Sequence, residues 1–456
     1  MIRTTIASAA ALLLAASPAA AQDAQERLDA RYDRALAAGY KALMLCSAIG
    51  HAELFGARRS AESVERYELS GIYPKLDPIL ADLTATIERG ADGVIDHVTV
   101  PFAQDMPPRI ALHIPDKGCI DLPVGSAVPG GLDRFESSTE IDRSDDFDGV
   151  AATRGEALAR TAFDPVYGEG ARTTAAVVLQ RGELASEAYG PDHGPRVPQR
   201  TWSVAKSIAA TIIGGFQQGG LINTADSAGL GEADDDPRRA ITVDHLLRMA
   251  SGRYSDTPGN RTDPLYFGGS LVAETAAHWP LIHPPGTVYR YANNDTLMAI
   301  GALASFRDQP GFDAFFPALG MNSTIAERDA EGDYILSSQV WSTARDLARL
   351  GQLHLDGGVL PSGERILPEG WTDYVSSPAG PQPEGRPFGY GAGWWLLNAS
   401  EGVPPDTYAA MGNRGQFVVV VPSRDVVIVR RGEDPAGQGG FDIAAFTRDV
   451  LAALED

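Results

Sequence analysis

Lysine, cysteine and long apolar runs are all scarce in this chain of 456 residues. Lysine and arginine together number 38 against 60 acidic residues, which gives a formal net charge of -22. Nucleic acids and anionic lipids bind surfaces with clustered positive charge. We therefore expect no nucleic-acid partner and interpret the excess of acidic residues as a solubilising surface. No stretch approaches the roughly 20 apolar residues of a transmembrane helix, which predicts no stable membrane insertion.

The first 21 residues have the pattern of a secretory signal peptide. A short apolar run from Ile6 to Ala16 is followed by small residues at Ala19 to Ala21, where a signal peptidase would cut. We therefore expect a secreted or periplasmic protein whose mature chain begins at Gln22.

The chain has only two cysteines, Cys46 and Cys119. An even number in an exported protein favours one disulfide, and a zinc site would need more ligands. No His-x-x-x-His helix or Cys/His cluster appears, so we expect no metal and no cofactor. A Gly-x-Ser-x-Gly elbow is also missing, which argues against a Ser-His-Asp hydrolase of the α/β type, and Lys206-Ser207 lacks the glycines of a phosphate-binding loop.

The sequence divides at about residue 150. Residues 22–149 form an N-terminal region of unknown role, which ends in an acidic stretch, Glu136 to Asp148, that is typical of a domain boundary. In this region we predict a helix over residues 23–49 and strands over residues 94–100 and 109–114.

Residues 150–456 begin and end with predicted β-hairpins. The first has strands over 173–179 and 185–189 around Arg181-Gly182, and the second has strands over 416–421 and 425–430. Strands at both ends with helices between them predict an α+β fold, in which one antiparallel sheet is flanked by helices and carries a helical subdomain. The helices are predicted over residues 202–218, 243–250, 296–304, 342–354 and 443–454.

After Lys117 the only lysine is Lys206, three residues beyond Ser203. On a helix this spacing puts both side chains on one face, so the amine can approach the hydroxyl. Burial can lower the pKa of a lysine until it accepts a proton, whereas a guanidinium stays charged. A helix start also leaves the Ser203 N–H able to stabilise an oxyanion. The ordinary alternative is a lysine that faces water.

Two later segments carry groups suited to acyl transfer. Tyr291 follows a Pro-Gly turn and, held as phenolate, could take the Ser203 proton, while the Asn293 amide could hold Lys206 or a substrate carbonyl. A core tyrosine beside a turn asparagine is the alternative. Before the last hairpin, Gly412 indicates close approach by a ligand or another strand, or only a bulge.

These segments, in this order, resemble the Ser-x-x-Lys, Tyr-x-Asn and Lys-Thr-Gly elements of serine beta-lactamases and penicillin-binding proteins. The stretches WSVAK (202–206), ITVDHLLRMASG (241–252) and YGAGWW (390–395) are similar to the class C-like branch, and within it to 6-aminohexanoate-dimer hydrolases and related esterases. The resemblance covers about residues 150–456. It implies a beta-lactamase/transpeptidase-like fold with an N-terminal extension.

The resemblance also implies roles for single residues. Ser203 becomes the nucleophile that carries the acyl group, Lys206 its partner and Tyr291 the general base. Asn293 orients by hydrogen bonding, and the N–H groups of Ser203 and Asn413, beside Gly412, form the oxyanion hole.

The sequence departs from the family where Lys-Thr-Gly would stand, because Ala410-Met411-Gly412 occupies that place. In the family this lysine helps to receive a substrate carboxylate. Arg414 would stand about 13 Å further along a regular strand, so it is no replacement. We therefore predict that the substrate is a small ester or amide. The alternatives are a beta-lactamase, a D-Ala-D-Ala peptidase, or a catalytically silent protein that binds cell-wall peptides.

Overall fold

The computed structural model describes residues 18–91, 93–114, 117–128, 145–254, 262–306, 310–436 and 440–455. Residues 1–17 of the predicted signal peptide and residues 129–144, most of the predicted boundary, lie outside the described residues. None of the described helices is both long and apolar enough to cross a membrane.

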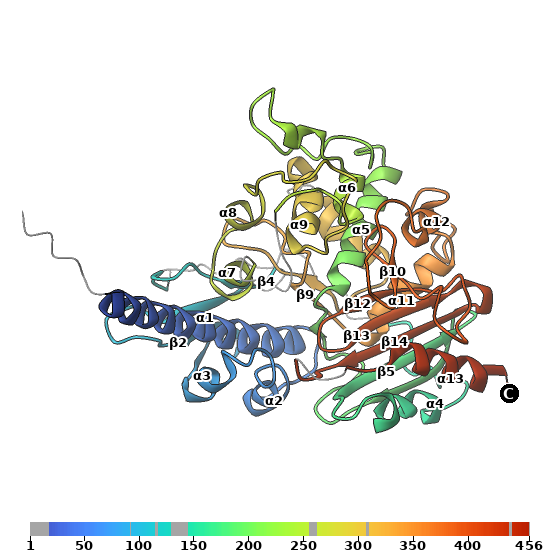
Figure 1. The fold of residues 1–456 in the computed structure, drawn as a ribbon. Coiled ribbons are helices and arrows are strands. Elements are labelled where there is room, and N and C mark those ends of the chain that lie inside the picture. The colour runs from blue at the N-terminus through green and yellow to red at the C-terminus, as the bar shows by residue number, and fades with distance from the viewer. Residues whose placement is uncertain are drawn as a thin grey trace, which may run out of the picture.

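The N-terminal region is a long helix packed on a small sheet (Figure 1). Helix α1 (Pro18–Leu54) packs on a sheet of four antiparallel strands, which pair in chain order. A disulfide between Cys46 of α1 and Cys119 of the last strand joins the two layers, as the sequence predicts. The other elements are α2 (Ala61–Tyr67), α3 (Asp77–Asp82), β1 (Thr86–Arg89), β2 (Ile95–Val100), β3 (Arg109–Ile114) and β4 (Gly118–Asp121).

The centre of the remaining chain is a seven-stranded antiparallel sheet built from both of its ends. The two predicted hairpins lie side by side in this sheet, because β5 pairs with β14. Arg181 and Gly182 both have positive φ, the conformation that a tight two-residue hairpin turn needs. In spatial order the strands are β10 (Gly389–Tyr390), β11 (Trp395–Leu396), β12 (Tyr408–Gly412), β13 (Gln416–Val421), β14 (Val426–Gly432), β5 (Thr173–Gln180) and β6 (Glu183–Tyr189).

Helices cover both faces of the seven-stranded sheet. Alternate side chains of β5 point to opposite faces, with Val177 and Leu179 in one apolar cluster and Ala176 and Val178 in the other. The first cluster includes α5 (Val204–Gln218) and α11 (Ala344–Leu355). The second includes α4 (Ala157–Arg160) and α13 (Ile443–Glu455). This sandwich buries the sheet and places the start of α5 against the end of β12 (Figure 1).

The middle of the chain forms the predicted helical subdomain above the sheet (Figure 1). A three-stranded sheet in the order β7, β9, β8 lies beneath it. Its strands are β7 (Gln199–Arg200), β8 (Ile325–Ala326) and β9 (Val340–Ser342), and the helices are α6 (Val243–Leu247), α7 (Asp263–Phe267), α8 (Val272–Ala276), α9 (Asn293–Gly301), α10 (Pro310–Ala318) and α12 (Trp371–Ser376).

Candidate active site

The predicted nucleophile stands at the start of helix α5. Ser203 is the N-cap residue, but its side chain does not cap the helix. Trp202 before it has φ 50°, a left-handed conformation that costs energy for a bulky residue and is typical of functional sites. The Arg200 guanidinium stacks 3.8 Å from the Trp202 ring centroid and supports this turn. The local backbone therefore presents the Ser203 hydroxyl to the groups around it.

Lys206 is the centre of the polar network. Its Nζ donates hydrogen bonds to Ser203 Oγ at 2.9 Å, to Asn293 Oδ1 at 2.7 Å and to the Ser337 carbonyl at 2.9 Å. These three bonds use all three donors of an ammonium group. The residue is only 1% exposed, and burial lowers the pKa of Lys206 to about 7. At neutral pH part of the amine is therefore deprotonated and can accept a proton.

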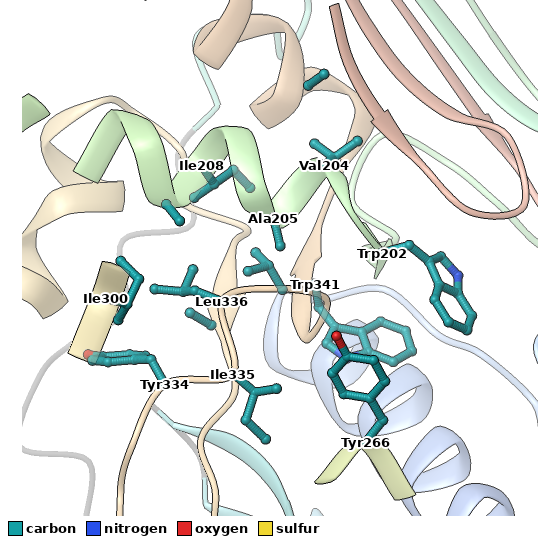
Figure 2. Packing of buried hydrophobic residues seen from close by; sticks show 14 of the residues in the cluster. Trp202, Val204, Ala205, Ile208, Tyr266, Ile300, Tyr334, Ile335, Leu336 and Trp341 are labelled. Atoms are coloured by element: carbon teal, nitrogen blue, oxygen red, sulfur yellow. The ribbon is translucent and has the colours of Figure 1, made fainter. Parts of the chain in front are cut away.

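Apolar packing holds the Ser337 carbonyl close to Lys206. Figure 2 shows Ala205 and Ile208 of α5 facing the segment that carries Leu336. All of these side chains belong to one buried cluster, and Leu336 is fully buried within it. The carbonyl that receives the Lys206 bond thus lies on a rigid segment.

Tyr291 is the second group that interacts with the Ser203 hydroxyl. The two hydroxyls are hydrogen bonded, and the Trp395 indole also bonds to the phenol. The Lys206 Nζ lies 5.0 Å from the centroid of the Tyr291 ring. Burial raises the pKa of Tyr291 well above its ordinary value, and the two hydrogen bonds offset this only in part. Burial therefore favours the protonated phenol, and the role of Tyr291 as general base stays a prediction.

Asn293 is oriented from both ends of its amide. Its Oδ1 accepts the bond from Lys206, and its Nδ2 donates to Thr262 Oγ1 at 3.0 Å. The side chain is buried at the start of α9, where it cannot rotate without losing a bond. The structure thus brings Ser203, Lys206, Tyr291 and Asn293 together, as the motifs predict.

Strand β12 approaches the start of α5 closely at Gly412. A Cβ atom at this position would lie 2.4 Å from the Thr201 carbonyl oxygen and 3.1 Å from the Ser203 nitrogen. Glycine is required here because any side chain would push the strand away from the helix. The turn that begins at Asn413 follows directly, so the predicted oxyanion residue is one position from this contact.

Neither Ala410 nor Arg414, each two positions from Gly412, brings positive charge to the site. Ala410 is fully buried in β12. Arg414 is 3% exposed and forms an ion pair with Glu433, with 2.8 Å between Nε and Oε2. Strand β12 ends at Gly412, so Arg414 belongs to a turn and not to the regular strand that we assumed. It points away from the Lys-Thr-Gly position.

Several residues of the site carry no motif signal that we used. The Ser337 carbonyl and the Thr262 hydroxyl come from loops distant in sequence, and only the fold shows their role. Trp395 and Gly393 lie in the YGAGWW stretch, which served only for the resemblance. A Cβ at Gly393 would lie 3.0 Å from the Lys206 carbonyl oxygen. The absence of a side chain at this glycine therefore lets its loop pack closely on α5.

A family model named beta-lactamase matches residues 158–432. The chain belongs to the beta-lactamase family. It is a serine hydrolase of the beta-lactamase/transpeptidase-like fold, as the resemblance predicts. The N-terminal region, residues 22–149, lies outside the matched part of this beta-lactamase-family chain.

Three relatives show how this family member compares with known proteins. It is 26% identical over 293 residues to the 6-aminohexanoate-dimer hydrolase of Paenarthrobacter ureafaciens, which covers 57% of this chain and 72% of that protein. A Bacillus anthracis protein assigned as a 6-aminohexanoate-dimer hydrolase superposes with a TM-score of 0.55 and 20% identity, over 67% of this chain and 86% of the other. A family VIII carboxylesterase has a TM-score of 0.51 and 17% identity, over 65% and 96%. These two structures support the fold.

Proposed function

We propose that this beta-lactamase-family protein is exported and cleaves carboxylic esters or small amides through an acyl-enzyme on Ser203. The observation that carries the proposal is the contact of 2.9 Å between Lys206 Nζ and Ser203 Oγ, together with the burial of that amine. A buried lysine with a pKa of about 7 is partly neutral at neutral pH, and its neutral amine can activate a serine hydroxyl by accepting the proton.

In this mechanism the neutral amine of Lys206 receives the Ser203 proton as Oγ attacks the substrate carbonyl. The N–H groups of Ser203 and Asn413 stabilise the oxyanion, and Gly412 lets the two segments approach. Tyr291 keeps its proton at rest and passes one to the leaving group, and Lys206 replaces it. Water then attacks the acyl carbonyl with Lys206 again as the base, and Lys206 returns this proton to Ser203 Oγ as the bond to the acyl group breaks.

The charge of the site supports a substrate without a carboxylate at the family's usual position. Ala410 provides no cation, and the Arg414 guanidinium is paired with Glu433. The names of the relatives, a 6-aminohexanoate-dimer hydrolase and a carboxylesterase, agree with amide or ester cleavage. The Cys46–Cys119 disulfide supports an oxidising compartment and hence export.

The decisive experiment compares the wild type with Ser203→Ala on three substrates: a p-nitrophenyl ester, a chromogenic cephalosporin and a linear amide. We expect wild-type turnover of the ester or the amide, a loss of at least about a thousandfold in the variant, and labelling of Ser203 by a fluorophosphonate. Ester hydrolysis that survives in Ser203→Ala would refute the mechanism. Fast cephalosporin turnover would refute the substrate class, and folded protein that takes no label would support the silent binder.

A further inference from the structure

The side chain of Arg414 leaves the hydrolase sheet and enters the N-terminal region. Its Nη2 donates to the backbone carbonyl of Tyr67, the last residue of α2, at 2.7 Å and to that of Ser70, three residues further on, at 3.0 Å. It also donates to the Glu433 carbonyl at 3.1 Å. Two of the three acceptors therefore belong to a part of the chain outside the family match.

The same arginine belongs to the turn that holds the predicted oxyanion N–H. Arg414 has φ 59° and follows Asn413, whose Oδ1 accepts the Arg414 N–H at 2.9 Å. The hydrolase sheet holds the backbone of this turn, because Arg430 Nη1 donates to the Gly415 carbonyl at 2.9 Å. The side chain of the central residue is held by the N-terminal region instead. The turn is thus fixed from two sides.

The carbonyls that receive Arg414 are themselves rigidly placed. Directly after α2, Glu68 forms a bidentate pair with Arg59 at 2.9 and 2.7 Å, and both side chains are buried. The Tyr40 hydroxyl of α1 donates to the Glu68 carbonyl at 3.3 Å. The charge pair thus joins the two ends of the α2 segment, and the Tyr40 bond joins the end of that segment to α1.

A second contact reaches the lysine side of the site. Tyr40 of α1 packs edge-to-face on Phe267 of α7 with ring centroids 5.3 Å apart. The neighbouring Tyr266 hydroxyl is hydrogen bonded to Ser337 Oγ at 2.8 Å, and the Ser337 carbonyl receives the Lys206 bond. Figure 2 shows Tyr266 beside the segment that carries Leu336. The N-terminal region thus touches the supports of both Lys206 and the oxyanion turn.

From this geometry we infer that the N-terminal region positions the catalytic centre, and that Arg414 transmits its position to the oxyanion turn. Arg414 is a positioning residue, since it acts through the Asn413 N–H. Oxyanion donors must lie within a few tenths of an ångström of their productive place, and a supporting shell determines this. The inference rests on the proposed function, because it requires acyl chemistry at Ser203.

The test is the double variant Arg414→Met with Glu433→Gln, which removes the side-chain link together with the carboxylate that pairs with Arg414. We expect kcat for a p-nitrophenyl ester, counted per fluorophosphonate-titrated site, to fall tenfold to about a hundredfold. KM should change less than about threefold, since the oxyanion contact strengthens in the transition state. Arg414→Lys keeps the charge and one donor toward the carbonyls, so it should recover part of kcat.

Arg66→Gln is the matched control. Arg66 of α2 forms an exposed ion pair with Asp192 at 3.3 Å, so this variant also cuts a link between the two regions but leaves the oxyanion turn untouched. Its kcat should equal that of the wild type. A double variant with wild-type kcat per titrated site, whatever its melting temperature, would overturn the inference, as would an equal loss in Arg66→Gln. If wild-type Ser203 takes no label, the proposed function fails and the inference fails with it.

Discussion

Lys206 and Tyr291 both interact with the Ser203 hydroxyl, and burial shifts the pKa values of their side chains in opposite directions. Loss of hydration disfavours the charged form of each, so it lowers the pKa of the amine and raises the pKa of the phenol. The amine becomes the better proton acceptor at neutral pH. In the proposed mechanism the phenol remains a proton donor and protonates the leaving group.

The pH profile of activity tests this division of roles. Below its pKa Lys206 is protonated and cannot receive the Ser203 proton, so kcat/KM for a neutral ester should rise with pH and level off above a midpoint of about 7. Lys206→Arg should be inactive at every pH, because a guanidinium stays protonated. Lys75→Arg on the surface is the control and should keep the wild-type profile. A flat profile from about pH 5 to 9 would contradict the role of Lys206.

The sequence was sufficient to predict site residues that are neighbours on one element or belong to a short motif. Ser203 and Lys206 share a helix face, so their contact follows from a spacing of three. The bonds of Thr262 to Asn293 and of Ser337 to Lys206 join segments far apart in the chain, and no local pattern encodes them. The direction of the Arg414 side chain could not be predicted either, because it depends on where β12 ends.

At the level of elements, local chemistry predicted the hairpins and the longer helices. Strand β14 was recognisable as a β-branched run, and the Arg181-Gly182 turn as a pair suited to positive φ. The order of the strands was not predictable, since β5 finds its partner β14 through packing of both sheet faces. The short strands β7 and β10 have only two residues each, too few for a period to show.

The disulfide between α1 and β4 should matter for stability. It closes a loop with a sequence separation of 73 and so restricts the unfolded chain. We expect Cys46→Ser with Cys119→Ser to lose about 3 to 4 kcal/mol of unfolding free energy. Denaturant unfolding of the variant and of the wild type, each with and without reductant, measures this.

Reductant supplies the internal control for this prediction. It should destabilise the wild type toward the variant and leave the variant unchanged. Equal stability of the oxidised wild type and the variant would show that the bridge adds nothing to the packing of α1 on β4.

On the scale of the whole molecule, the net charge of -22 affects which substrates reach the site. A strongly acidic protein repels anions over a distance that salt shortens. We therefore compare kcat/KM for a carboxylate-bearing p-nitrophenyl ester with kcat/KM for a neutral one. The first value divided by the second should rise about two- to fivefold between about 10 and 200 mM NaCl. The neutral ester serves as the control, and a ratio that does not respond to salt would exclude long-range repulsion.

The pairing of β5 with β14 has a consequence for biosynthesis. Ribosomes make the helix that carries Ser203 long before strand β14, yet the sheet that supports the site closes only when residues 426–432 pair with residues 173–180. The oxyanion turn after β12 also depends on β13 and on Arg430 of β14. A nascent chain therefore carries its nucleophile without the machinery to use it, and acyl transfer is confined to molecules whose synthesis is almost complete.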